Sequence, residues 1–204
     1  MEAISKQGML STLPIRSGEF TIRRWERQDV DARLEWPSYP FPYEAFSATH
    51  GDTSDQERDL LFRVRDEDDS RISLTVECQT KAVIGLIVLL DIDWKSGIVG
   101  NMGVRLSPEW CDKGIGTIVL RLVTAWCFEC GLKQLQLDVA APNGRAARCY
   151  EKVGFVRIKE CWQDDETLRK VNLDDPKQGF LLPHVRVKND TPQVRFYWMA
   201  IRRD

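Results

Sequence analysis

The sequence predicts a mixed α/β fold, and two observations lead to this expectation. Residues 99–140 show a strand, a long amphipathic helix and a second strand in direct succession, a unit that closes as a right-handed parallel crossover. The strand candidates at the end of the chain indicate antiparallel neighbours. Together they predict one sheet with both kinds of pairing.

A single domain accounts for the 204 residues. We expect residues 19–204 to form it and residues 1–18 to be a loose N-terminal extension. The hydrophobic fraction of 43% and the charged fraction of 29% are ordinary for globular proteins. These values exclude disorder, collagen or coiled coil for the whole chain.

The charge and hydropathy of the chain favour a cytoplasmic protein that binds neither nucleic acid nor membrane. The longest apolar run, residues 82–90, is shorter than the roughly 20 residues that cross a bilayer. Residues 1–10 lack the apolar stretch of a secretory signal. A formal net charge of −2 provides no general attraction to polyanions.

The first part of the chain predicts a strand at 20–25 and a short helix at 28–36. Residues 36–46 hold three prolines and five aromatic residues, which regular structure does not accommodate, and predict a structured loop. A helix is expected at 57–64. We expect the charged run 65–71 to be a solvated turn.

Three strand candidates follow at 72–79, 82–92 and 99–106. The second is almost purely apolar, as in a strand buried on both faces. The strongest helical pattern covers 114–130, with apolar residues at three- and four-residue spacing. Residues 133–140 alternate strictly and predict the next strand.

The last part of the chain predicts one helix and two strands. Asn143 can cap a helix that stops at Gly154. Strands are expected at 155–161 and 194–201, and a polar insert, residues 164–193, separates them. Connections of that length are usually functional or disordered.

Cys127 and Cys130 form a C-x-x-C pair among the six cysteines. Zinc binding or redox chemistry are the functional interpretations. However, no second pair accompanies them, and they lie in an apolar helical stretch. We therefore favour small apolar helix residues in a reducing compartment and expect no metal.

The segment from Leu106 to Thr117 joins a strand to the long helix through Gly114 and Gly116. Free amides at a helix N-terminus favour an anion such as phosphate, and glycines allow the backbone to approach it. A tight strand-to-helix turn would give the same pattern. Neither a P-loop nor a complete dinucleotide fingerprint is present.

The segment 143–155 reads N-G-R-A-A-R-C-Y-E-K-V-G-F. Together with the first segment it resembles the GNAT superfamily of acyl-CoA-dependent N-acyltransferases. Members show Q/R-x-x-G-x-G/A after the fourth strand. Later in the chain they often show N-x-x-A-x-x-x-Y-E-K-x-G-F, and residues 143–155 match this second motif at every specified position. Arg23-Arg24-Trp25 and Trp36-Pro37 resemble the Rim-like branch of the superfamily, which includes protein N-terminal acetyltransferases and small-molecule modifiers.

The resemblance implies a mostly antiparallel central sheet flanked by helices, with a β-α-β core that binds acetyl-CoA. The cofactor-binding residues would be Val104, Arg105 and Leu106 for the pantetheine arm, Asn143 for the pantetheine, and the amides of Asp112, Lys113, Gly114, Ile115, Gly116 and Thr117 for the pyrophosphate. Tyr150 would face the sulfur and protonate the leaving thiolate. Cys111 departs from the family pattern, which has Gln or Arg there. Lys113, Arg121, Arg145 and Arg148 would add positive charge, or are simply solvated.

The acceptor amine must lose a proton, since an alkyl ammonium with a pKa near 10.4 is almost fully protonated at pH 7. Gly100 stands where some members carry a glutamate base. Asp138, in Leu137-Asp138-Val139, matches a carboxylate five residues before the asparagine in other members. It is our candidate base, with a structural carboxylate as the alternative. Asp91 and Asp93 are the next candidates.

The resemblance also implies that the acceptor lies across the sheet from the cofactor. Candidate contacts are the insert 164–193 and the aromatic residues Trp36, Tyr39, Phe41, Tyr43 and Phe46, for which core packing is an equal alternative. We expect direct transfer of an acetyl group to a primary amine, of a small molecule or a protein N-terminus, in a ternary complex. A non-catalytic acyl-CoA sensor is the competing hypothesis. The oligomeric state is open: many members of the family form homodimers, but no residue of this sequence identifies an interface.

Overall fold

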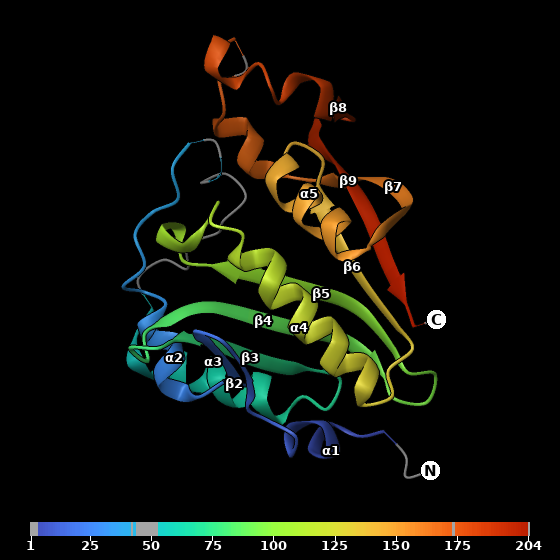
Figure 1. Ribbon diagram of the computed structural model, residues 1–204. Coiled ribbons are helices and arrows are strands. Elements are labelled where there is room, and N and C mark those ends of the chain that lie inside the picture. The colour runs from blue at the N-terminus through green and yellow to red at the C-terminus, as the bar shows by residue number, and fades with distance from the viewer. Residues whose placement is uncertain (1–3, 42, 44–52, 173, 204) are drawn as a thin grey trace.

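The computed structural model describes residues 4–41, 43, 53–172 and 174–203. Within these residues the chain forms a mixed sheet of nine strands (Figure 1). The strands are β1 (Ile15–Ser17), β2 (Phe20–Arg24), β3 (Ile72–Cys78), β4 (Val83–Asp93), β5 (Ile98–Leu106), β6 (Gln134–Ala140), β7 (Val156–Asp164), β8 (Val185–Lys188) and β9 (Thr191–Arg202). Their order is β1-β2-β3-β4-β5-β6-β9-β7, with β8 also paired to β9.

Helices cover both faces of this sheet. They are α1 (Lys6–Leu10), α2 (Arg27–Ala32), α3 (Asp55–Glu67), α4 (Ile115–Glu129) and α5 (Gly144–Val153). Helices α4 and α5 lie on one face, and α2 and α3 lie on the other (Figure 1). Among the described strand pairs only β5–β6 is parallel. The predicted mixed, mostly antiparallel sheet is therefore confirmed.

The sheet opens between β5 and β6. The two strands pair only where they begin, Ile98 with Gln134 and Val99 with Leu135. Beyond these residues β6 pairs only with β9, over its whole length from Gln134 to Ala140. The residues of β5 that follow Val99 therefore have no partner on the β6 side. This divergence creates space inside the sheet where α4 and α5 begin.

Gly100 lies at an irregularity beside this opening. Asp91, opposite it on β4, has a φ of 51°. A Cβ on Gly100 would lie 2.8 Å from the Cβ of Asp91, closer than carbon atoms approach. A glutamate base therefore does not fit at position 100 in this backbone.

The N-terminal extension is not loose. The side chain of Met9 is 2% exposed and belongs to the core. The indole Nε1 of Trp126 on α4 donates to the hydroxyl of Thr12 at 2.7 Å. The expectation failed because the mixed composition of the segment does not reveal that Met9 reaches the core or that Thr12 accepts a hydrogen bond from a buried indole.

Helix α3 extends further than predicted, to Glu67. The prediction of a solvated turn at 65–71 is therefore wrong. Arg65 on α3 and Arg71 just before β3 are both partly buried and line a cavity. The partial burial of these arginines could not be predicted from the charged residues around them, because charge alone does not reveal which side of a helix faces the sheet.

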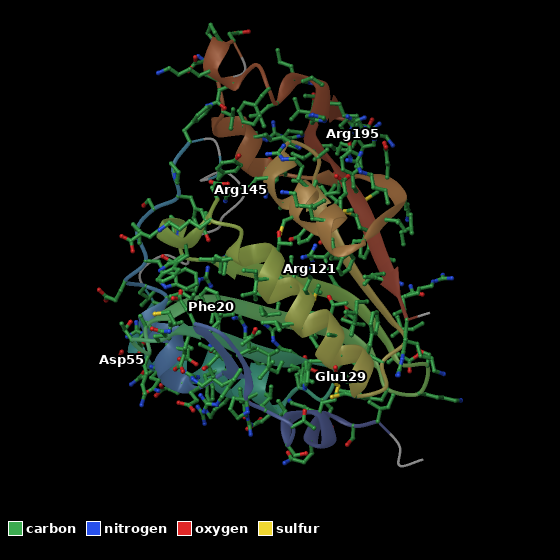
Figure 2. All side chains as sticks on the ribbon, in the orientation of Figure 1. Phe20, Asp55, Arg121, Glu129, Arg145 and Arg195 are labelled. Carbon is green, nitrogen blue, oxygen red and sulfur yellow. The ribbon has the colours of Figure 1, made fainter. Side chains whose placement is uncertain are left out.

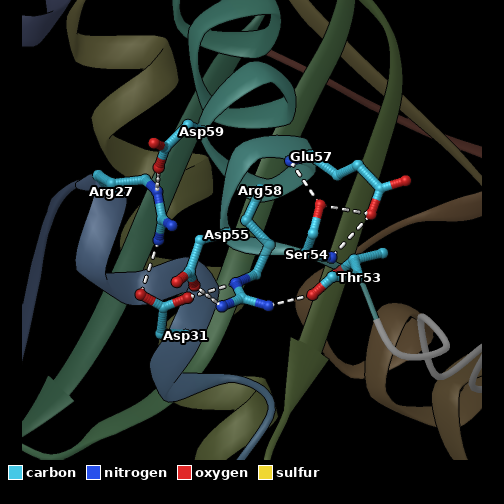
Figure 3. Close-up of polar contacts among 8 residues, drawn as sticks. All are labelled: Arg27, Asp31, Thr53, Ser54, Asp55, Glu57, Arg58 and Asp59. Atoms are coloured by element: carbon cyan, nitrogen blue, oxygen red, sulfur yellow. Dashed lines mark hydrogen bonds and ion pairs between the residues drawn. The ribbon is translucent and has the colours of Figure 1, made fainter.

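Helices α2 and α3 are joined by a network of ion pairs (Figure 3). Arg27 on α2 contacts Asp31 at 2.7 Å and also Asp59 on α3. Arg58 on α3 contacts Asp31 at 2.7 Å and also Asp55. Both helices thus use acidic side chains to bind arginines that lie between them.

The insert 164–193 is folded rather than disordered where the structure describes it. Three 3-10 helices, η3 (Glu166–Lys170), η4 (Pro176–Gln178) and η5 (Leu182–His184), are followed by β8, which pairs with β9. Leu181 is 2% exposed. Phe180 packs edge-on against Phe41, with ring centroids 5.7 Å apart, so the insert contacts the proline-rich loop.

Candidate active site

A cavity of about 740 Å³ occupies the opening between β5 and β6. Its walls come from β5, the start of α4, β6 and α5. Ten of the twelve predicted site residues line it: Val104, Arg105, Leu106, Asp112, Gly114, Gly116, Thr117, Asp138, Asn143 and Tyr150. Lys113 and Ile115 do not line it: the Lys113 Nζ lies 5.6 Å from the Trp110 ring centroid, and the Ile115 side chain is in the core.

The N-terminus of α4 presents free amides to this cavity. Gly114 precedes the helix with a φ of 77°, and no side chain caps the helix there. The amides of residues 112–116 donate to no acceptor among the described residues, whereas Thr117 N already bonds the carbonyl of Gly114 at 3.1 Å. Such a group of amides at the positive end of a helix suits a phosphate.

The departure at Cys111 leaves this arrangement in place. The thiol lines the cavity, and its Sγ lies 3.6 Å from the carbonyl of Ser107. Burial raises the pKa of the Cys111 thiol, so it is neutral at pH 7. Since the amides come from the backbone, a cysteine in place of Gln or Arg does not remove them.

Tyr150 on α5 is 7% exposed and lines the cavity. Its hydroxyl makes no hydrogen bond to any described residue. Burial, then the charges of Cys149 and Asp138, raise the pKa of Tyr150 above its usual value of 10. The phenol therefore keeps its proton at neutral pH and is free to donate it.

Asp138 on β6 is bound by two side-chain amides. Asn101 Nδ2 on β5 donates to Oδ1 at 3.1 Å, and Gln163 Nε2 on β7 donates to Oδ2 at 3.1 Å. Neither amide was predicted as a site residue, because nothing in their local sequence marks them. The contacts orient the carboxylate and leave the remaining lone pairs of both oxygens available.

Asp91 and Asp93 lie outside the cavity lining. Asp93 accepts hydrogen bonds from Lys95 N and from Ser96, and the Ser96 hydroxyl is the main cause of its lowered pKa. It therefore stabilises the turn between β4 and β5. Of the three carboxylates proposed as the base, only Asp138 lies in the cavity.

The candidate basic residues are divided between two environments. Arg148 lines the cavity. Arg145, at the start of α5 (labelled in Figure 2), also lines it, and its guanidinium carbon lies 3.8 Å from the centroid of the Tyr43 ring. Arg121 on α4 donates to the carbonyl of Lys152 at 3.0 Å and is not in the lining. Only the first two can add charge to a bound anion.

The aromatic loop contributes less than predicted. Tyr39 alone among its described aromatic residues lines a cavity, and its hydroxyl donates to the carbonyl of Leu106. Trp36 Nε1 donates to the Val83 carbonyl at 2.9 Å, and Phe41 packs on the insert. Phe46 lies outside the described residues. Trp36 and Phe41 therefore pack within the fold, the alternative interpretation.

Asn143 combines two roles in its position before α5. Its Oδ1 accepts from the amide of Ala146 at 3.2 Å, which caps the helix as predicted. The NH₂ group of the same side chain is a hydrogen-bond donor, and Asn143 lines the cavity. A contact of this donor with pantetheine stays a prediction.

Comparisons with known proteins show which family and which solved structures the chain resembles. The family model described as "Acetyltransferase (GNAT) family" matches residues 25–155. No curated protein matches. Spermidine N-acetyltransferase from Vibrio cholerae, solved with CoA and spermine, is similar in structure, with a TM-score of 0.66, 20% identity, and coverage of 91% of this chain and 96% of that one.

Two related structures are similar to the same extent. A chimera of the Vibrio cholerae enzyme SpeG and hSSAT has a TM-score of 0.64 with 21% identity. The match covers 91% of this chain and 96% of the chimera. A dodecameric structure of the Vibrio cholerae enzyme has a TM-score of 0.61 with 21% identity. The match covers 91% of this chain and 95% of that one.

At this identity the solved structures show the shared fold, whereas the family model spans well over half of the chain. The chain belongs to the GNAT family of acetyltransferases, enzymes that transfer an acetyl group from acetyl-CoA to an amine.

Proposed function

We propose that this protein acetylates a primary amine directly from acetyl-CoA in a ternary complex. One observation carries the proposal. A single cavity, at the opening between β5 and β6, brings together free helix amides, a protonated tyrosine and an oriented carboxylate. These are the three elements that the transfer needs.

The residues around the α4 N-terminus fit the cofactor. The amides of residues 112–116 have no acceptor among described residues, and Gly114 and Gly116 place no side chain in front of them. They would bind the pyrophosphate, with Arg145 and Arg148 adding charge. The unpaired side of β5 at Val104 and Leu106 would bind the pantetheine arm, once Tyr39 releases the Leu106 carbonyl.

Bound acetyl-CoA supplies an activated thioester. The amine nitrogen bonds to the carbonyl carbon and the carbon–sulfur bond breaks. Tyr150 donates its phenolic proton to the departing thiolate, and Asp138 takes the proton that the amine gives up. The hydrogen bonds from Asn101 and Gln163 hold the Asp138 carboxylate for this step.

The direct test is a transfer assay. Purified protein, acetyl-CoA and a panel of primary amines, both small molecules and peptides, are incubated together. The proposal predicts release of free CoA thiol and an equal amount of amine heavier by one acetyl group. Tight acetyl-CoA binding without any acetylated product would instead support a sensor that holds the cofactor.

We also propose that the protein acts in the cytoplasm and self-associates. All six cysteines are free in the structure, which suits a reducing compartment. Among the described helices, none combines the length and apolar character that crossing a bilayer requires. Self-association is suggested by the dodecameric Vibrio cholerae relative, and a measurement of molar mass in solution tests it.

A further inference from the structure

A second cavity of about 330 Å³ lies on the face of the sheet covered by α2 and α3. It shares the β5 residues 103–105 with the larger cavity. Four arginines line it: Arg33 after α2, Arg65 on α3, Arg71 before β3, and Arg105 on β5. No aspartate or glutamate occurs among the described residues of its lining.

The position of this cavity connects it to the reaction centre. Leu86 pairs with Arg105, Val88 with Gly103, and Leu90 with Asn101. Residues 101, 103 and 105 therefore follow one another on one face of β5, and Asn101 contacts Asp138. Four residues along a strand span about 13 Å. The contact with Asp138 and the side chain of Arg105 therefore lie along the same face of β5, within the length of a small molecule.

The aspartates of α2 and α3 form their ion pairs with arginines other than Arg65 and Arg71. Asp29 binds Arg23 through two hydrogen bonds of 2.7 and 2.8 Å, and Asp66 binds Arg24 in the same way. Asp31, Asp55 and Asp59 belong to the network of Arg27 and Arg58 (Figure 3). These five aspartates therefore bind arginines outside the cavity.

The arginines of the cavity act on one another instead. Burial, and then the charges of Arg105 and Arg65, lower the pKa of Arg33 to about 10. Burial and Arg105 lower the pKa of Arg65, and burial and Arg65 lower that of Arg71. Neither Arg65 nor Arg71 forms an ion pair with a described residue, although Asp68 acts on Arg71 at a distance. Arg33 and Arg105 make further interactions.

The wall of the cavity also holds a donor without an acceptor. Trp25 lines it, and its indole Nε1 is buried without a hydrogen-bond partner among the described residues. Clustered guanidinium groups match the geometry of carboxylate and phosphate oxygens. A cationic ligand such as a polyamine would be repelled by the same charges.

We propose that the acceptor carries an anionic group, a carboxylate or a phosphate, which binds in the cavity lined by Arg33, Arg65, Arg71 and Arg105 while its primary amine lies at Asp138. This inference rests on the proposed acetyltransferase function. It distinguishes this chain from the relative solved with spermine, which is a cation.

Matched acceptors test the charge preference. The pairs are 6-aminohexanoate against its amide, and 6-aminohexyl phosphate against 6-aminohexanol, with spermidine as the cationic comparison. Within each pair the amine is the same distance from the variable group. We expect kcat/KM to be at least tenfold higher for one or both anionic members, and the two pairs distinguish a carboxylate from a phosphate. Equal or better use of the neutral members, or of spermidine, would overturn the inference.

Variants connect the preference to the arginines. Arg65→Gln combined with Arg71→Gln should lower kcat/KM at least tenfold for the anionic acceptor and leave the neutral acceptor within about threefold. Arg65→Lys with Arg71→Lys keeps the charge and should recover part of the loss. Arg16→Gln on β1, at a residue that lines neither cavity, is the matched control. An equal loss with both kinds of acceptor would contradict the inference.

A binding measurement covers the case in which no acceptor of the panel is acetylated. With acetyl-CoA saturating, sulfate should raise the Tm of the wild type above that in chloride of equal ionic strength, and the double glutamine variant should lose this shift. The same shift in both proteins, or none in the wild type, would refute the anion site. Absence of both acetyl-CoA stabilisation and transfer would refute the proposed function itself, and with it this inference.

Discussion

Asn101 on β5 donates to Asp138 on β6 at 3.1 Å, across a gap where the two strands no longer pair through their backbones. These two side chains thus connect β5 and β6 at a point where the backbones of the two strands have separated. Gln163 on β7 holds the other oxygen of the same carboxylate. The two contacts hold the candidate base in the wall of the larger cavity.

Asp138→Asn should lower kcat by about 10² to 10⁴, the range for loss of a general base. The NH₂ group of an asparagine at position 138 would also face the NH₂ group of Asn101 or Gln163. Two donors cannot bond each other, which costs about 1–3 kcal/mol of stability. Asp93→Asn is the control: it should affect the β4–β5 turn and leave kcat unchanged. An unchanged kcat in Asp138→Asn would show that another group is the base.

Tyr150→Phe should lower kcat by a similar factor of about 10² to 10⁴ while the KM for acetyl-CoA changes little, because only the proton donor is lost. Tyr197→Phe is a matched control, since Tyr197 is 8% exposed and lies outside the cavity lining. Pre-steady-state kinetics ensure that chemistry is the step observed. Full turnover in Tyr150→Phe would exclude it as the acid.

Tyr150 also predicts how stability depends on pH. Its pKa is raised in the folded protein, above the usual value of about 10 that the unfolded chain retains. Between these values the unfolded state loses the proton and the folded state keeps it, so the folded protein loses stability as the pH rises above about 10. Tyr150→Phe lacks this loss. Urea unfolding at pH 8 and pH 10.5 should therefore show a smaller decrease for the variant than for the wild type, and equal decreases would contradict the assignment.

Acetyl-CoA at about 100 times its Kd should stabilise the protein by about 2.7 kcal/mol, which is a rise in Tm of roughly 5–10 °C. Gly116→Ala should reduce this rise while leaving the unliganded Tm nearly unchanged. The new Cβ would lie 3.4 Å from the Cys149 sulfur, an ordinary contact, but it would stand in the wall of the cavity. Gly114→Ala should instead lower the unliganded Tm, because its φ of 77° is strained for alanine. An unchanged acetyl-CoA shift in Gly116→Ala would remove this turn from the binding site.

Met9→Ala should destabilise the protein by about 2–5 kcal/mol, the usual range for truncating a buried methionine. The control Val187→Ala, at a side chain that is 71% exposed, should change stability by less than about 0.5 kcal/mol. Chemical denaturation measures both. A neutral Met9→Ala would mean that residues 1–18 are an appendage after all.

Much of the fold and part of the candidate site were predictable because they depend on neighbours in the chain. Strand alternation predicted β6, and three- and four-residue spacing predicted α4. Gly114 and Asn143 marked the helix starts at which the cofactor is expected to bind. The resemblance to the GNAT family then pointed to Tyr150. In the structure the predicted site residues line one cavity, except Lys113 and Ile115.

What the sequence by itself determined is therefore local: the period of each strand and helix, the glycines that leave amides free, and a motif that identifies the family. Only the tertiary structure decided which distant side chains meet. Asn101 and Gln163 reach Asp138 through the arrangement of β5, β6 and β7, and four arginines from separate elements converge because α2 and α3 pack over β3–β5. Such contacts depend on strand register and on the side of a helix that faces the sheet, and neither is encoded by the residues next to them in the chain.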